Sequence, residues 1–152
     1  MDLKTEMTVK EVARPKSVSR SDNAKLPLYS SRPAAGFPAP GDDQVERVLD
    51  INDLVVQNQA STFFVRVEGD SMIGAGIFSG DVLVIDRSKE AKDGVIVVAA
   101  INGEMVVKRL RRSSSRRNLE LVSENEEYKP IVMGEDEDCT IWGVVVGSVR
   151  QF

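Results

Sequence analysis

The sequence predicts a mostly β protein, with one twisted, partly closed β-sheet domain behind a flexible N-terminal arm. From about residue 44 to the end, short runs of β-branched and aromatic residues alternate with turn signals. Two of these runs are joined by Asn102-Gly103, the strongest short hairpin signal. The 152 residues, of which 41% are hydrophobic, suffice for one packed domain of about 100 residues with a tail.

Residues 1–35 differ in composition from the rest of the chain. They hold seven basic and four acidic residues, a net charge of +3, which leaves −7 for the remainder of a chain whose net charge is −4. Few of their apolar residues recur at a regular spacing, so we expect a flexible arm over 1–35 and a β-rich domain over 36–152. The stretch "LPLYSSRPAAGFPAPGDD" predicts an extended, proline-punctuated segment across this boundary.

Six runs in the body are predicted strands. In chain order they lie in "STFFVRVEG", "DVLVIDR", the two halves of "GVIVVAAINGEMVVKRL", "NLELVSEN" and "CTIWGVVVGSVRQF". Only "INDLVVQNQ" has a helical pattern, and either Asn52 or Asp53 is its expected N-cap. Strands in this number with one short helix predict an all-β sheet that curls on itself.

Composition excludes several classes of site. The chain contains no histidine, which rules out Ser-His-Asp and Cys-His catalysis and argues against a zinc site. We therefore expect no metal or other cofactor. The single cysteine, Cys139, permits no intramolecular disulfide, as suits a reducing cytoplasm. No apolar run has the length of a membrane span or a signal peptide, so the expected location is the cytoplasm, without membrane association.

Ser71 lies in "GDSM", between a predicted strand and a glycine-rich turn. A serine in such a place is most often a turn or cap residue. It can also be a nucleophile, although the G-x-S-x-G elbow of the α/β-hydrolases is absent. Because there is no histidine, a catalytic Ser71 would need another base.

The Asn102-Gly103 hairpin offers a candidate base, Lys108. In a two-residue loop the facing pairs are Ile101 with Glu104, Ala99 with Val106, and Val97 with Lys108. Alternation then places Lys108 on one side of its strand with Val106 and Leu110. Lys108 could protect a solvent-facing sheet edge. It could instead be buried, where lost hydration disfavours the charged form and a neutral amine can act as general base. A Ser-Lys dyad needs no histidine.

The segments "AGFPAP", "GDSM", "GDVLVID" and "GEMVVKRL", in this order, resemble the UmuD branch of the LexA-type self-cleaving Ser-Lys peptidases. The resemblance covers about three quarters of the chain, from Ala35 to the end. It implies a β fold of the LexA/signal-peptidase type. It also implies that Ser71 is the nucleophile, that Lys108 is its base, held neutral by apolar neighbours, and that Ala35–Gly36 is the cleaved bond. UmuD itself has a cysteine before the cut glycine. This chain has Ala35 there, and the repressors also have alanine.

The same resemblance implies a biological role. Members form homodimers, and RecA filaments on single-stranded DNA stimulate their cleavage in the SOS DNA-damage response. The trimmed UmuD dimer is the accessory subunit of an error-prone Y-family translesion polymerase, UmuC. The main alternative is a LexA-like repressor inactivated by self-cleavage, although residues 1–35 lack the periodicity and length of a helix-turn-helix domain. A signal-peptidase relative and a non-cleaving binding module are weaker alternatives.

Two further segments have ordinary interpretations. The stretch "RLRRSSSRRNLEL", with five arginines from Arg109 to Arg117, is expected to be a solvated hairpin loop; the alternative is contact with DNA or an acidic partner. The acidity of the body predicts weak or absent direct DNA binding. Asp70 is expected to form the turn before Ser71, and Met72 to pack beside the site.

Overall fold

The computed structural model describes residues 5–14, 25–29, 45–113, 118–132 and 138–152. The chain divides into two compact units, residues 1–15 with 58–152, and residues 16–57. This division follows contacts in the folded chain. The predicted boundary after residue 35 describes the products of a cleavage and stays a prediction.

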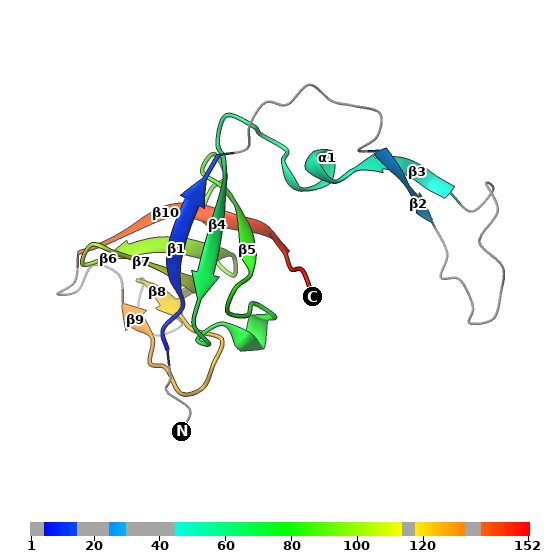
Figure 1. Ribbon diagram of the computed structural model, residues 1–152. Coiled ribbons are helices and arrows are strands. Elements are labelled where there is room, and N and C mark those ends of the chain that lie inside the picture. Colours follow the sequence, from blue (N-terminus) through cyan, green and yellow to red (C-terminus); the bar gives the residue numbers. More distant parts are fainter. Residues whose placement is uncertain (1–4, 15–24, 30–44, 114–117, 133–137) are drawn as a thin grey trace. The chain divides into compact units, whose positions relative to one another are not determined.

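The larger unit is a six-stranded antiparallel barrel (Figure 1), so the predicted mostly β fold is confirmed. Around the barrel the strands are β1 (Thr8–Ala13), β4 (Thr62–Glu68), β5 (Val82–Asp86), β10 (Cys139–Val149), β6 (Ile96–Ile101) and β7 (Glu104–Arg112). The barrel closes where β1 also pairs with β7, through Thr8 and Val106. Two short strands, β8 (Leu119–Val122) and β9 (Ile131–Val132), extend the sheet from the C-terminal half of β7.

The strand that closes the barrel comes from the segment predicted to be a flexible arm. Residues Thr8–Ala13 form β1, which lies beside β4 with a register shift between Val9 and Glu11. The prediction of an irregular arm is therefore wrong for this stretch. The sequence pattern did not indicate this strand because β1 contains no fully buried residue and four of its six residues are exposed, while the fully buried Met7 lies just before it.

The β6–β7 hairpin has the predicted register, with Val97 opposite Lys108 and Ile101 opposite Glu104. Asn102 and Gly103 both have positive φ, 49° and 82°, as a two-residue hairpin turn requires. This geometry fixes which side of β7 each side chain takes, and so it determines where Lys108 points.

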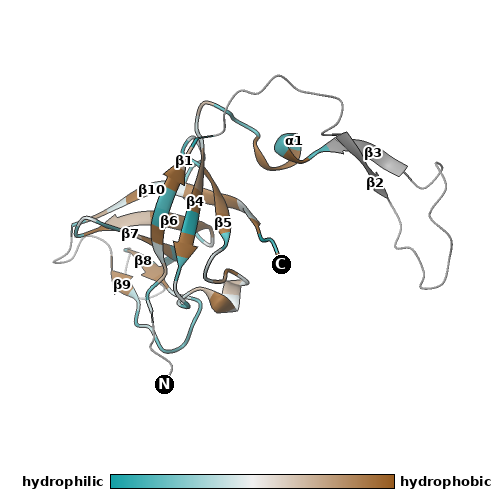
Figure 2. Ribbon diagram, in the orientation of Figure 1, coloured by the Kyte–Doolittle hydropathy of each residue, from teal (hydrophilic) through white to brown (hydrophobic). Residues whose placement is uncertain are grey.

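The core consists of two adjoining clusters of buried apolar side chains. One contains Met7, Val65, Val67, Met72, Ile77, Leu83, Ile85, Val98 and Val107. The other contains Val97, Ala99, Ile101, Val106, Leu110, Leu121 and Val144. In the second half of β4, buried Val65 and Val67 alternate with exposed Arg66 and Glu68, as expected for a strand with one face toward the interior, and Figure 2 shows both brown and teal along this strand. Met72 belongs to the first cluster, as expected for a residue that packs beside the site.

The smaller unit contains β2 (Lys25–Tyr29) and β3 (Val45–Asp50), which pair antiparallel, and the helix α1 (Ile51–Val55). The predicted helix is confirmed but is shorter, and its N-cap is Asp50, whose carboxylate accepts the Asn52 N–H at 2.9 Å. Asp50 also ends the strand β3, so the sequence pattern alone placed the N-cap two or three residues too late.

The arginine-rich segment is only partly a loop. β7 runs to Arg112, so Arg109, Arg111 and Arg112 are strand residues, and the first two pair with Glu124. The interpretation as a hairpin loop is therefore wrong for these three, while residues 114–117 lie outside the described part. In the described ranges, no helix is both long and apolar enough to cross a membrane.

Candidate active site

Ser71 lies just after β4 and is completely buried. Its hydroxyl donates to Glu6 Oε1 at 3.0 Å and accepts the backbone N–H of Met7 at 2.9 Å. Both partners belong to the N-terminal segment. The candidate nucleophile is therefore covered by a part of the chain that lies about 65 positions earlier.

Lys108 is 1% exposed, so the buried alternative is confirmed and the solvent-facing one is wrong. The family resemblance implied that apolar neighbours surround Lys108, but its ammonium also has polar neighbours. The ammonium nitrogen lies 2.6 Å from Glu6 Oε1 and donates to Ser123 Oγ at 2.6 Å. It also lies 5.8 Å from the ring centre of Tyr128. Polar contacts on two sides thus offset the lost hydration of a buried charge.

The side chains of Ser71 and Lys108 share one contact atom, Glu6 Oε1. The serine hydroxyl and the lysine ammonium both contact Glu6 Oε1, so they lie within two hydrogen-bond lengths of each other. Lysine and serine at such a separation can exchange a proton after a small side-chain movement. The structure thus brings together the two residues singled out from the sequence, with Glu6 between them.

Sequence reasoning missed Glu6 and Ser123. Glu6 lies in the segment taken for a flexible arm, and its contact depends on β1 pairing that no local pattern indicates. Ser123 directly follows β8, and the β7–β8 register places its neighbour Val122 opposite Arg109. The loop between β7 and β8 is long, so this register could not be counted from the sequence as the β6–β7 register could.

Asp70 does more than form a turn. Its carboxylate accepts the Tyr128 hydroxyl at 2.7 Å and the Thr5 N–H at 3.1 Å, and its own N–H donates to the Thr5 carbonyl at 2.9 Å. Burial, with the hydrogen bond to Asp70, raises the pKa of Tyr128 well above its usual range. Tyr128 is therefore a neutral phenol near Lys108 at all physiological pH values, and Asp70 anchors the N-terminal segment.

Gly69 allows the close approach of that segment. Its φ of +120° is a conformation that residues with a side chain rarely adopt. A Cβ built on it would lie 2.6 Å from the Glu6 carbonyl oxygen and 2.7 Å from the Met7 Cα. Only glycine at this position lets the backbone of residues 6–7 lie against the turn that carries Ser71.

The predicted cleavage site, Ala35–Gly36, lies outside the described residues. Residues 30–44, which contain it, connect the paired strands β2 and β3. Within the described part of the chain, no group of three or more His, Cys, Asp or Glu side chains is arranged to hold a metal ion.

Comparison with known proteins places these features in a family. The profile described as "Peptidase S24-like" matches residues 27–146. "Protein ImpA" of Salmonella typhimurium is 42% identical over 138 residues, which cover 91% of this chain and 92% of ImpA. "Protein SamA" of the same species is 38% identical over 125 residues, covering 82% of this chain and 85% of SamA. "LexA repressor 1" of Xanthomonas oryzae is 39% identical over 137 residues, covering 90% of this chain and 66% of the repressor. The chain therefore belongs to the Peptidase S24-like family, the family of LexA and UmuD.

Proposed function

We propose that this protein is a self-cleaving serine peptidase that cuts its own Ala35–Gly36 bond with Ser71 and Lys108. The observation that carries the proposal is the shared contact of the Ser71 hydroxyl and the Lys108 ammonium with Glu6 Oε1, in a chain without histidine. Both groups are buried, and burial of a serine–lysine pair has no evident structural need, because an apolar pair would fill the same space at lower desolvation cost. The family membership supports the same assignment.

In the proposed reaction, the neutral amine of Lys108 accepts the Ser71 proton while Oγ attacks the carbonyl carbon of Ala35. The tetrahedral intermediate then collapses, the Ala35–Gly36 bond breaks, and Lys108 returns the proton to the Gly36 nitrogen. Water hydrolyses the remaining ester and frees Ser71. The amides of Ser71 and Met72 are the candidate oxyanion donors, because those of Asp70 and Ile73 already donate to Thr5 and Asp70.

The proposal is tested by the rate of self-cleavage of the full chain at alkaline pH, where more Lys108 is neutral. Ser71→Ala and Lys108→Met should each lower the rate by at least about 1000-fold, since each removes a group required in the transition state. Lys92→Met, on an exposed loop lysine, is the matched control and should cleave like the wild type. Cleavage at an undiminished rate in either dyad variant excludes the mechanism.

For the biological role, we propose a cytoplasmic homodimer that cleaves itself when RecA filaments form during the SOS response. The trimmed dimer then serves an error-prone Y-family polymerase of the UmuC kind. The similarity to ImpA and SamA along nearly their whole lengths supports this mutagenesis branch. A LexA-like repressor is the second candidate, favoured by the 39% identity to a LexA repressor. Co-purification with a Y-family polymerase supports the first, and sequence-specific operator binding the second.

A further inference from the structure

The N-terminal segment occupies the candidate active site as a bound strand. Residues from Thr8 pair with β4 on one side, and the Met7 carbonyl accepts the Val107 N–H of β7 at 3.1 Å on the other. The Met7 side chain is fully buried in the core, and Glu6 beside it points its carboxylate at the dyad. An extended peptide added to sheet edges, with an anchored side chain, is a common mode of peptide recognition.

This arrangement is incompatible with catalysis for two reasons. The Ser71 hydroxyl donates its hydrogen bond to Glu6 Oε1, and the Lys108 nitrogen contacts the same oxygen, so the serine proton is directed at the carboxylate and not at the amine that should accept it. The Met7 N–H donates to Ser71 Oγ, so the hydroxyl faces an amide hydrogen and not a carbonyl carbon that it could attack. The segment is thus bound as an inhibitor and not as a substrate.

We propose that the groove between β4 and β7 is a strand-binding site whose resident ligand, residues 5–13, inhibits the dyad until it leaves. The site takes an extended peptide in which an acidic side chain reaches Lys108 and the next residue fills an apolar pocket. This inhibition rests on the proposed function. The bond to be cut and the inhibitory strand lie in the same 35 residues, and they compete for one site. Cleavage after Ala35 also separates the inhibitory strand from the domain that it closes.

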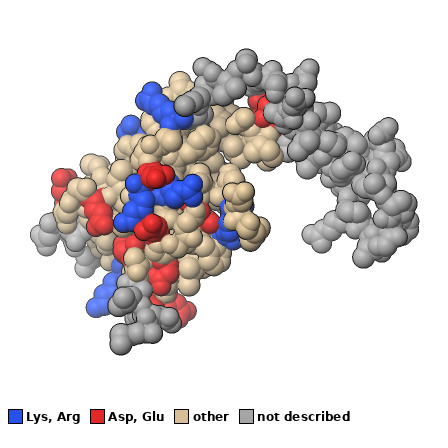
Figure 3. Space-filling view, in the orientation of Figure 1, with Lys and Arg blue, Asp and Glu red and all other residues tan. Residues whose placement is uncertain are grey.

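Ion pairs outside the dyad add to the binding of β1. Figure 3 shows blue and red side chains side by side on the face that carries β1 and β4, and these include Arg66 with Glu11 at 3.7 Å and Lys10 with Glu68 at 4.0 Å. Such exposed pairs contribute little individually. The main contributions come from the β1–β4 ladder and the buried Met7, so a change at the exposed pairs leaves the docked strand in place.

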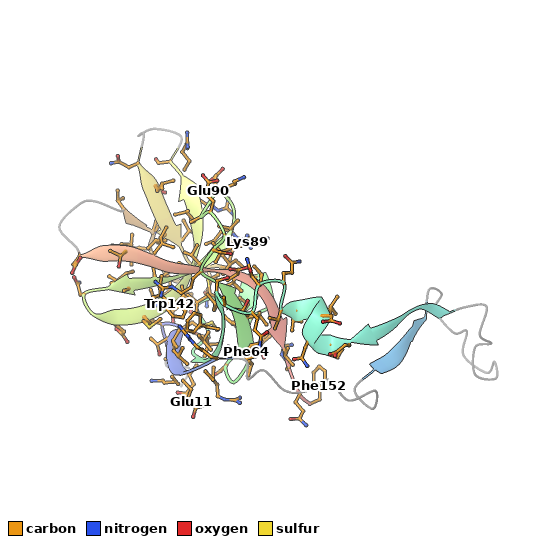
Figure 4. The ribbon with its side chains drawn as sticks, turned by 90° about the horizontal axis from the view of Figure 1, so that it is seen from above. Glu11, Phe64, Lys89, Glu90, Trp142 and Phe152 are labelled. Carbon is orange, nitrogen blue, oxygen red and sulfur yellow. The ribbon has the colours of Figure 1, made fainter. Side chains whose placement is uncertain are left out.

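A reversible cross-link between β1 and β4 tests the proposal in the full chain. Glu11 and Arg66 are directly paired across the two strands and both are exposed, and Glu11 is seen at the outer surface in Figure 4. Paired strand positions have Cα separations within the range of a disulfide. The double variant Glu11→Cys/Arg66→Cys, made with Cys139→Ser, should lock β1 in place when oxidised and release it when reduced.

The expected result is at least a tenfold slower self-cleavage for the oxidised variant than for the same sample after reduction, measured by intact mass at alkaline pH. Equal rates in the two states, with the disulfide verified by mass, would overturn the proposal, because the dyad would then act with β1 in place. If the wild type itself never cleaves, the proposed function fails instead. A circular dichroism spectrum of the oxidised form identical to that of the wild type excludes misfolding as the cause.

A second pair of variants needs no cysteine. Glu6→Gln removes the charge that faces Lys108 and should accelerate self-cleavage at neutral pH by about tenfold, the value of one charge-assisted contact. Glu90→Gln removes an exposed carboxylate from a loop outside both β1 and the dyad, and should change the rate less than twofold. A slower reaction in Glu6→Gln would mean that Glu6 assists the dyad, and would contradict the inhibitory role.

Discussion

Met7→Ala is expected to release the inhibitory strand without touching the dyad. The Met7 side chain is fully buried in the first core cluster, and replacing such a side chain by alanine costs about 2–5 kcal/mol through lost apolar burial and a residual cavity. The cost falls on the state with β1 docked, because Met7 is in water when the strand is released. At 1.4 kcal/mol per factor of ten, even about 2 kcal/mol raises the released population about 30-fold.

The assay is the rate of self-cleavage at neutral pH, together with hydrogen exchange of the β1 amides, which reports local opening of the strand. Both should rise by about 30-fold or more in Met7→Ala. Val12→Ala, on the same strand but with a side chain that is 47% exposed, should leave both within about twofold. If Met7→Ala speeds exchange but leaves cleavage at the wild-type rate, release of β1 does not control the dyad, and the reasoning is refuted.

The remaining predictions concern the scaffold. Arg150 and the N–H of Phe78 hold the pKa of the Asp81 carboxyl below its usual range, so this carboxylate stabilises the fold above about pH 4 and that contribution is lost as the pH falls through its lowered value. Urea unfolding of Asp81→Ala should show a loss of about 1–3 kcal/mol at pH 7, as expected when hydrogen bonds to a charged group are removed, and a smaller loss at pH 2. In β10, Gly143→Ala should lower the unfolding free energy by about 1–3 kcal/mol, because the added Cβ would lie 2.5 Å from the core side chain of Ile85. Gly147→Ala should be almost neutral, because its Cβ would have no neighbour closer than 4.0 Å. Equal midpoints for the two glycine variants would contradict this packing argument.

Local signals in the sequence were enough for the hairpin and its register, but they left open whether Lys108 is buried or faces solvent. Asn102-Gly103 defines its own turn, and the two-residue loop allows the register to be counted directly to Val97 and Lys108. Six strands of the body were found for the same reason, since each is a short β-rich run between turn residues, whereas β3 and β9 were missed. The family resemblance then supplied the pairing of Ser71 with Lys108, which no local pattern contains.

The contacts that no local pattern encodes were missed. β1 has too few apolar residues to read as a strand, and it is stable only because β4 and β7 provide partners far along the chain. Glu6 was missed with it, although Glu6 is the residue that joins the two halves of the candidate site. The sequence contains one sign of this contact, Gly69. A glycine before "DSM" indicates that another backbone segment approaches closely, but it does not indicate which segment.

The most direct test of the central claim is the mass of the products formed by the full wild-type chain at alkaline pH, beside a Ser71→Ala sample treated in the same way. We expect two fragments from the wild type, residues 1–35 and residues 36–152, and an intact Ser71→Ala chain. A cut at any other bond, or the same cut in Ser71→Ala, would contradict this claim.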